Sequence, residues 1–187
     1  MTGRLILSMS VSIDGFISDR DGNFDWSGPS AEQFAFHTEE VRALGGYVSG
    51  RRLYETMLPW ETDPAMRSDE AMSEFADVWS ALPKVVFSRT LDRVEGNARL
   101  ATASLTDEIA AVRASTEMDV AVGGADLGAQ AFELGLVDDL RIFRYPVVVG
   151  GGTPLLPPVT GKIDLELVAT RTFGDRVVFE HYQRSAR

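Results

Sequence analysis

The sequence predicts an α/β fold, in which helices cover a central, mostly parallel sheet and an antiparallel hairpin forms its C-terminal edge. Apolar, strand-like runs alternate with helix-like segments up to about residue 140, and strand-like runs dominate from there on. The chain has 187 residues, of which 44% are apolar and 25% are charged. This size and composition fit one globular domain, residues 1–187, with a sizeable core.

In the first half of the chain, each expected strand ends at a glycine or is followed by a polar residue, and a helix follows most of them. Ser30 can cap the first helix, whose apolar positions lie on one face, and Pro59 ends the second helix. A turn-rich stretch follows the first strand at residues 19–23, and the polar stretch 61–70 is expected to be a surface loop. We expect strands at residues 5–11, 47–50 and 85–87, and helices at residues 30–44, 51–57 and 71–80.

The second half begins with the same alternation and then changes to strands alone. A short apolar run ends at Gly123 and Gly124, and a helix-like segment starts at once. Near the C-terminus, residues 173–176 separate two strand-like runs and are typical of a hairpin turn. We expect strands at residues 98–102, 119–122, 140–149, 165–172 and 177–182, and helices at residues 104–115 and 125–134.

Composition excludes several classes of function. The net charge of −10 argues against a nucleic-acid partner, which needs a basic face. The chain has no cysteine, and its two histidines, His37 and His181, lie far apart, so we expect no metal site. No apolar run approaches the roughly 20 residues that span a membrane, and the N-terminus lacks a signal-peptide pattern. We therefore expect a cytoplasmic protein that contacts no membrane.

Three strand ends carry residues that suit a phosphorylated ligand. Gly50, Arg51 and Arg52 end one expected strand, Ser88 and Arg89 follow another, and Gly123 and Gly124 end a third. Glycines let a ligand approach the backbone, free helix N-terminal amides attract anions, and arginine grips phosphate with paired hydrogen bonds. Each feature also has a simpler interpretation: glycines that only turn the chain, solvated arginines, and a serine that caps a turn. The G-x-G-x-x-G fingerprint and the P-loop are both absent.

The ordered set of motifs resembles the dihydrofolate reductase superfamily, and more closely its branch related to the reductase domain of bacterial riboflavin biosynthesis. The likeness covers nearly the whole chain and is carried by residues 10–17, 49–55, 122–125, 135–140 and 146–155. It implies a dihydrofolate reductase-like fold, NADPH as hydride donor and a homodimer. It places the adenosine phosphate near Arg51, Arg52, Ser88 and Arg89. It places the pyrophosphate and nicotinamide near Gly123, Gly124, Ala125, Asp126 and Leu127.

The chain departs from the folate enzymes at two places. Leu53 stands where they usually have threonine, and the glutamates of the first helix lie in no apolar setting that would single out a pterin-binding carboxylate. The chain also lacks the deaminase domain that the riboflavin enzyme usually carries. These departures argue against folate as the substrate and against a stand-alone role in riboflavin biosynthesis.

The candidate residues for the substrate pocket are Asp14, Trp26 and Tyr54. Asp14 lies at the end of the first strand between apolar neighbours and is the catalytic candidate, although Asp14-Gly15 is also a good turn pair. Trp26 could stack on a flat ring or pack in the core. We expect an NADPH-dependent oxidoreductase that reduces a small heterocyclic, carbonyl or imine substrate. The alternative is a non-catalytic nucleotide- or ligand-binding protein with the same fold.

Overall fold

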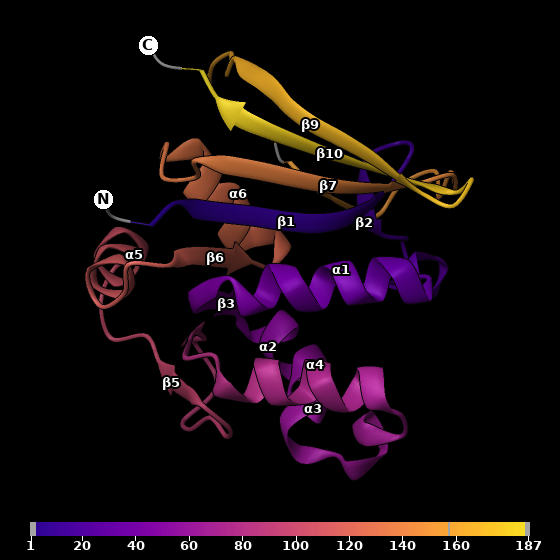
Figure 1. Cartoon of the computed structure of the whole chain (residues 1–187). Helices are drawn as coiled ribbons and strands as arrows, with labels where there is room; N and C mark the ends of the chain where they lie inside the picture. The colour runs from indigo at the N-terminus through magenta and orange to yellow at the C-terminus, as the bar shows by residue number, and fades with distance from the viewer. Residues whose placement is uncertain (1–2, 157, 186–187) are drawn as a thin grey trace.

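The structure is a computed structural model that describes residues 3–156 and 158–185. In this part of the chain, eight strands form one sheet in the order β5-β4-β3-β6-β1-β7-β10-β9 (Figure 1). The strands from β5 to β7 are parallel, and β10 pairs antiparallel with both β7 and β9. The bounds are β1 (Leu5–Ser12), β3 (Leu44–Gly50), β4 (Lys84–Phe87), β5 (Ala98–Leu100), β6 (Asp119–Gly123), β7 (Asp139–Tyr145), β9 (Leu165–Phe173) and β10 (Val177–Arg184).

Helices cover both faces of this sheet. The helices α1 (Ala31–Arg42) and α4 (Glu70–Ala81) lie side by side on one face, and α5 (Leu105–Ala114) and α6 (Ala125–Glu133) pack on the other (Figure 1). Shorter elements connect them: α2 (Arg51–Met57), α3 (Pro59–Thr62), the 3-10 helices η1 (Asp25–Ser27) and η2 (Pro64–Arg67), and a small sheet of β2 (Phe16–Ser18) and β8 (Thr153–Pro154). No described helix is long and apolar enough to cross a membrane.

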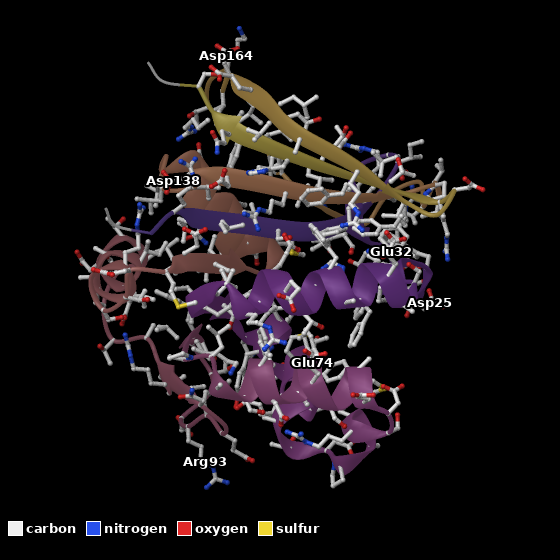
Figure 2. All side chains as sticks on the ribbon, viewed as in Figure 1. Asp25, Glu32, Glu74, Arg93, Asp138 and Asp164 are labelled. Atoms are coloured by element: carbon white, nitrogen blue, oxygen red, sulfur yellow. The ribbon has the colours of Figure 1, made fainter. Side chains whose placement is uncertain are left out.

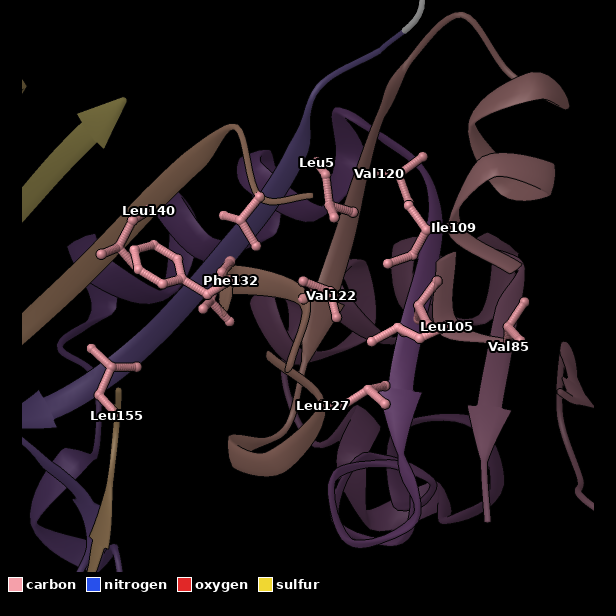
Figure 3. Packing of buried hydrophobic residues seen from close by; sticks show 14 of the residues in the cluster. Leu5, Val85, Leu105, Ile109, Val120, Val122, Leu127, Phe132, Leu140 and Leu155 are labelled. Atoms are coloured by element: carbon pink, nitrogen blue, oxygen red, sulfur yellow. The ribbon is translucent and has the colours of Figure 1, made fainter. Parts of the chain in front are cut away.

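The main core lies between the sheet and the helices α5 and α6 (Figure 3). Side chains alternate along β1, so that Leu5, Leu7 and Val11 point into this core and meet Phe132 and Leu127 of α6. Each Å² of apolar area removed from water contributes about 25 cal/mol, so this burial contributes most to holding α6 against the sheet. It thereby fixes the position of the α6 N-terminus.

The opposite face carries two aromatic cores. In one, Phe36 of α1 packs against Phe143, Phe173 and Phe179 of the antiparallel strands. In the other, Phe75 of α4 packs against Phe34 and Trp60 and stacks on Trp79 of the same helix. Aromatic pairs at these separations add about 0.5–1.5 kcal/mol each beyond the area they bury. They hold α1 and α4 on the sheet.

The expected fold class is confirmed, including the antiparallel C-terminal hairpin, but several element boundaries differ. The first helix ends at Arg42, and Leu44 already belongs to β3. The strand expected at residues 140–149 ends at Tyr145, because Pro146 has no N–H for the ladder and the chain then turns through glycines with positive φ. Residues 61–70 are not an irregular loop, because the end of α3, the helix η2 and the first residue of α4 lie in them.

Candidate functional site

The three expected strand ends lie next to one another in the structure. The strands β4, β3 and β6 are neighbours and run parallel, so their C-terminal ends meet at one edge of the sheet. A cleft of about 620 Å³ opens there. It is lined by Gly50, Arg51, Arg52, Leu53, Phe87, Ser88, Arg89, Thr90, Gly124, Ala125, Asp126, Leu127, Gln130 and Thr153.

The N-terminus of α6 forms one wall of this cleft. Its N-cap residue is Gly124, which has φ +93° and no side chain to cap the helix. In contrast, Ser30, Asp69 and Ser104 cap α1, α4 and α5 through their side-chain oxygens. Among the described residues, the first amides of α6 therefore have neither an intrahelical nor a capping partner, and the helix dipole adds a positive potential. This end of α6 is suited to an anion.

Gly123 and Gly124 have different structural roles. A Cβ atom on Gly124 would lie 3.5 Å from the backbone nitrogen of Gly50, so the limit there is the positive φ rather than space. A Cβ atom on Gly123 would lie 2.4 Å from the hydroxyl oxygen of Tyr47 and 2.5 Å from Leu53 Cδ2. Gly123 therefore packs beneath the turn and is not among the lining residues, whereas Gly124 lines the cleft.

Arginines give the opposite wall a positive charge. Arg51 and Arg52 begin α2, and Arg89 follows β4; all three side chains are exposed. Arg51 Nη1 lies 3.8 Å from Glu55 Oε1, while no ion pair to Arg52 or Arg89 occurs among the described residues. Two guanidinium groups are thus available to a phosphate, which they can bind with charge-assisted hydrogen bonds.

Ser88 combines the two roles considered for it. Its Oγ accepts hydrogen bonds from the amides of Thr90 (3.1 Å) and Leu91 (3.0 Å), which is a turn-capping role. The residue nevertheless lines the cleft, and its hydroxyl proton remains available to donate.

Tyr54 and Asp14 are held by other parts of the protein and do not line the cleft. The Tyr54 side chain is buried, and its hydroxyl accepts a hydrogen bond from the Glu95 amide at 2.7 Å. The Asp14 carboxylate accepts from the amides of Gly150 (2.8 Å) and Val149 (3.2 Å). A hydrogen bond from Ser12 together with these two amides lowers the Asp14 pKa, so the exposed carboxylate is ionised at neutral pH.

Trp26 belongs to a polar group beneath α1. Its ring meets the edge of Tyr145 at a centroid distance of 5.8 Å, and Gln33 Nε2 donates to the Tyr145 hydroxyl at 2.7 Å. Burial raises the Tyr145 pKa, so its phenol is neutral at neutral pH. Trp26 Nε1 and Gln33 Oε1 are buried without a hydrogen-bond partner among the described residues. Tyr145 pairs with Ser12 at the C-terminal end of β1, which places this group at the same edge of the sheet as the cleft.

Some of these residues had no signal in the sequence. Thr90 and Phe87 flank a predicted motif, and Gln130 lies one helical turn after Asp126, so these three positions could be inferred from their neighbours. Thr153, Gln33 and Tyr145 are different, because tertiary packing brings them to this edge. Gln33 and Tyr145 are 112 positions apart in the chain.

Comparison with known proteins identifies the family. The family described as the RibD C-terminal domain matches residues 4–179. The chain belongs to this family. An uncharacterized protein of Bacillus subtilis, YyaP, is 31% identical over 94% of this chain and 92% of its own length.

Solved structures share the fold of this RibD C-terminal domain protein. A putative riboflavin biosynthesis protein from Shewanella has a TM-score of 0.78 and 23% identity, with both chains fully covered. Dihydrofolate reductase from Enterococcus faecalis, solved in complex with NADP(H), has a TM-score of 0.67 and 16% identity over 100% of this chain and 99% of that one. The dihydrofolate reductase-like fold is therefore confirmed, and the family and fold are associated with reductases.

Proposed function

We propose that this protein is an NADPH-dependent reductase that transfers a hydride to a small heterocyclic, carbonyl or imine substrate. The observation that carries the proposal is the cleft, where Gly50–Arg52, Ser88–Arg89 and Gly124–Leu127 come together from three strand ends. The complex of the structurally similar dihydrofolate reductase with NADP(H) supports the choice of cofactor.

The residues that line the cleft fit the parts of this cofactor. The free amides of Ala125, Asp126 and Leu127 would bind the pyrophosphate, and the bare Gly50 and Gly124 backbones leave it room. Arg52 and Arg89 would bind the phosphate of the adenosine ribose. When bound, NADPH supplies the hydride, while the protein contributes alignment and the exclusion of water.

On the acceptor side, we propose that Trp26 contacts the substrate together with Gln33 and Tyr145. Trp26 Nε1, a donor, and Gln33 Oε1, an acceptor, are buried without a hydrogen-bond partner among the described residues, and the group lies at the edge of the sheet where the cleft opens. For Asp14 we propose the turn role that we considered beside catalysis, because both oxygens of its carboxylate already accept backbone amides of the loop at residues 149–150.

Cofactor titration tests the proposal. We expect NADPH to bind at least tenfold more tightly than NADH, because one charge-assisted hydrogen bond contributes about 1.5–3 kcal/mol and about 1.4 kcal/mol corresponds to tenfold. Equal dissociation constants would contradict the assignment of the arginines.

Turnover is tested with NADPH and a panel of pterins, flavin precursors and imines, by following cofactor absorbance. Oxidation of NADPH with one of them supports a reductase. Binding of NADPH without turnover across a broad panel would instead favour a non-catalytic binding protein. The cytoplasmic location and the homodimer both stay predictions. Sedimentation velocity on the purified protein tests whether it is a dimer.

A further inference from the structure

The segment from Ser88 to Asn97 connects β4 to β5 without regular secondary structure. Its first three residues, Ser88, Arg89 and Thr90, line the cleft. Ser88 caps the turn that contains Arg89, but beyond Leu91 the connection has no ladder or helix, so its path depends on contacts with other elements.

One such contact comes from α2. The side chain of Tyr54 is only 6% exposed, and its hydroxyl accepts a hydrogen bond from the Glu95 amide at 2.7 Å and donates to the Glu95 carbonyl at 3.3 Å. Both the donor and the acceptor capacity of the buried hydroxyl are thereby used. Tyr54 lies two residues after Arg52, so this hydroxyl joins the helix that carries Arg51 and Arg52 to the segment that carries Arg89.

A second contact holds the far end of the segment. Glu61 Oε2 accepts the Asn97 amide at 2.8 Å, and Glu61 Oε1 pairs with Lys84 Nζ at 2.9 Å; the two side chains are 6% and 3% exposed. Lys84 Nζ also donates to the carbonyls of Trp79 and Leu82, so all three of its protons have acceptors. A Cβ on Gly96 would lie 2.3 Å from Glu61 Oε2, which shows how tightly the backbone approaches this carboxylate.

We propose that Tyr54 and Glu61 are positioning residues that set the spacing between the arginines of α2 and Arg89, and so determine the preference for a dinucleotide that carries an additional phosphate monoester. This inference rests on the proposed function. Neither residue touches the cofactor; both act through the segment from Ser88 to Asn97. The substrate-pocket role that the sequence suggested for Tyr54 stays a prediction.

The variant Tyr54→Phe tests the proposal, because it keeps the ring in its packing and removes only the hydroxyl. We expect the dissociation constant for NADPH to rise about three- to tenfold, the scale of one hydrogen bond, while that for NADH changes less than twofold. Amide hydrogen exchange in residues 88–97 of the free protein should become faster. The matched control is Tyr182→Phe on β10, which removes the same atom from a strand remote from the cleft and should change neither quantity.

The outcomes separate this inference from the proposed function. Wild-type protein that prefers NADPH, with Tyr54→Phe showing the same preference, would overturn the positioning role alone. An equal loss of affinity for both dinucleotides in Tyr54→Phe would also overturn it, because that pattern indicates general loss of structure. Wild-type protein that binds neither dinucleotide would overturn both proposals.

Discussion

Arg89 and Arg93 lie on the same irregular segment but in different surroundings. Arg89 lines the cleft, whereas the side chain of Arg93 extends away from the molecule (Figure 2). The same side chain in two settings allows the contribution of one guanidinium group to be separated from that of overall charge, since both substitutions remove one positive charge from the same loop.

Arg89→Gln should raise the dissociation constant for NADPH about tenfold and leave that for NADH nearly unchanged. A charge-assisted hydrogen bond to phosphate is worth about 1.5–3 kcal/mol, and exposure to solvent places the effect at the lower end of this range. Calorimetric titration at two salt concentrations measures it, and the effect should shrink at high salt. Arg93→Gln is the control; an equal loss of affinity in both variants would show that only net charge matters.

At the scale of the elements, the N-cap residue of each helix explains why the first backbone amides of α6 are free. The other long helices begin with a serine or an aspartate that occupies a backbone amide, but α6 begins with Gly124 at φ +93° and ψ 139°. This conformation is open to glycine and costly for other residues. Gly50, the N-cap of α2, has an ordinary φ of −77°, and a Cβ there would meet nothing within 4 Å. The backbone conformation at position 124 therefore requires glycine, whereas position 50 can accept a side chain.

Gly124→Ala should lower the free energy of unfolding by about 1–3 kcal/mol, because alanine strains the positive-φ turn. It should also weaken NADPH binding, since relief of the strain rotates the first amides of α6. Gly50→Ala should leave the free energy of unfolding within about 0.5 kcal/mol of wild type. Urea denaturation of both variants measures the difference, and equal stabilities would contradict the turn geometry.

The elements also show which features could be predicted from sequence. Glycines and arginines after apolar runs indicate the cleft correctly, because the ends of parallel strands meet at one edge. The apolar periodicity places Leu44 in a helix because it continues an apolar face, but pairing with Asp119 on β6 draws it into β3. Tertiary pairing overrides local periodicity at such boundaries.

At the scale of the whole molecule, local sequence patterns do not predict the strand order, because β7 pairs with β1 although more than a hundred residues separate them in the chain. Long-range packing likewise joins Gln33 to Tyr145. Buried carboxylates secure this topology at both sides of the sheet. The Asp139 carboxylate, which is 1% exposed, accepts hydrogen bonds from Arg4 and His181. The Glu108 carboxylate accepts hydrogen bonds from Arg99 and from the amides of Thr102 and Ala103.

These carboxylates make the free energy of unfolding depend on pH in the acidic range. The hydrogen bond from Arg99, helped by the two amides and opposed by burial, lowers the pKa of Glu108 from 4.5 to about 2. At Asp139, burial acts to raise the pKa, but the hydrogen bonds from Arg4 and His181 outweigh it and lower the pKa. A depressed pKa in the folded state stabilises the fold above the unfolded pKa, and this stabilisation is lost as pH falls through the folded pKa.

Glu108→Gln should therefore lower the free energy of unfolding by about 1–3 kcal/mol at pH 7, and by less near pH 2, where about half of the wild-type Glu108 is protonated. Between about pH 4.5 and pH 2 the variant should show a shallower pH dependence than the wild type. Denaturant unfolding at a series of pH values measures both slopes. Glu74→Gln is the control, because its surface ion pair with Arg42 leaves the carboxylate 56% exposed and should be worth less than about 1 kcal/mol. Parallel pH curves for Glu108→Gln and the wild type would show that the contacts of Glu108 do not persist in solution.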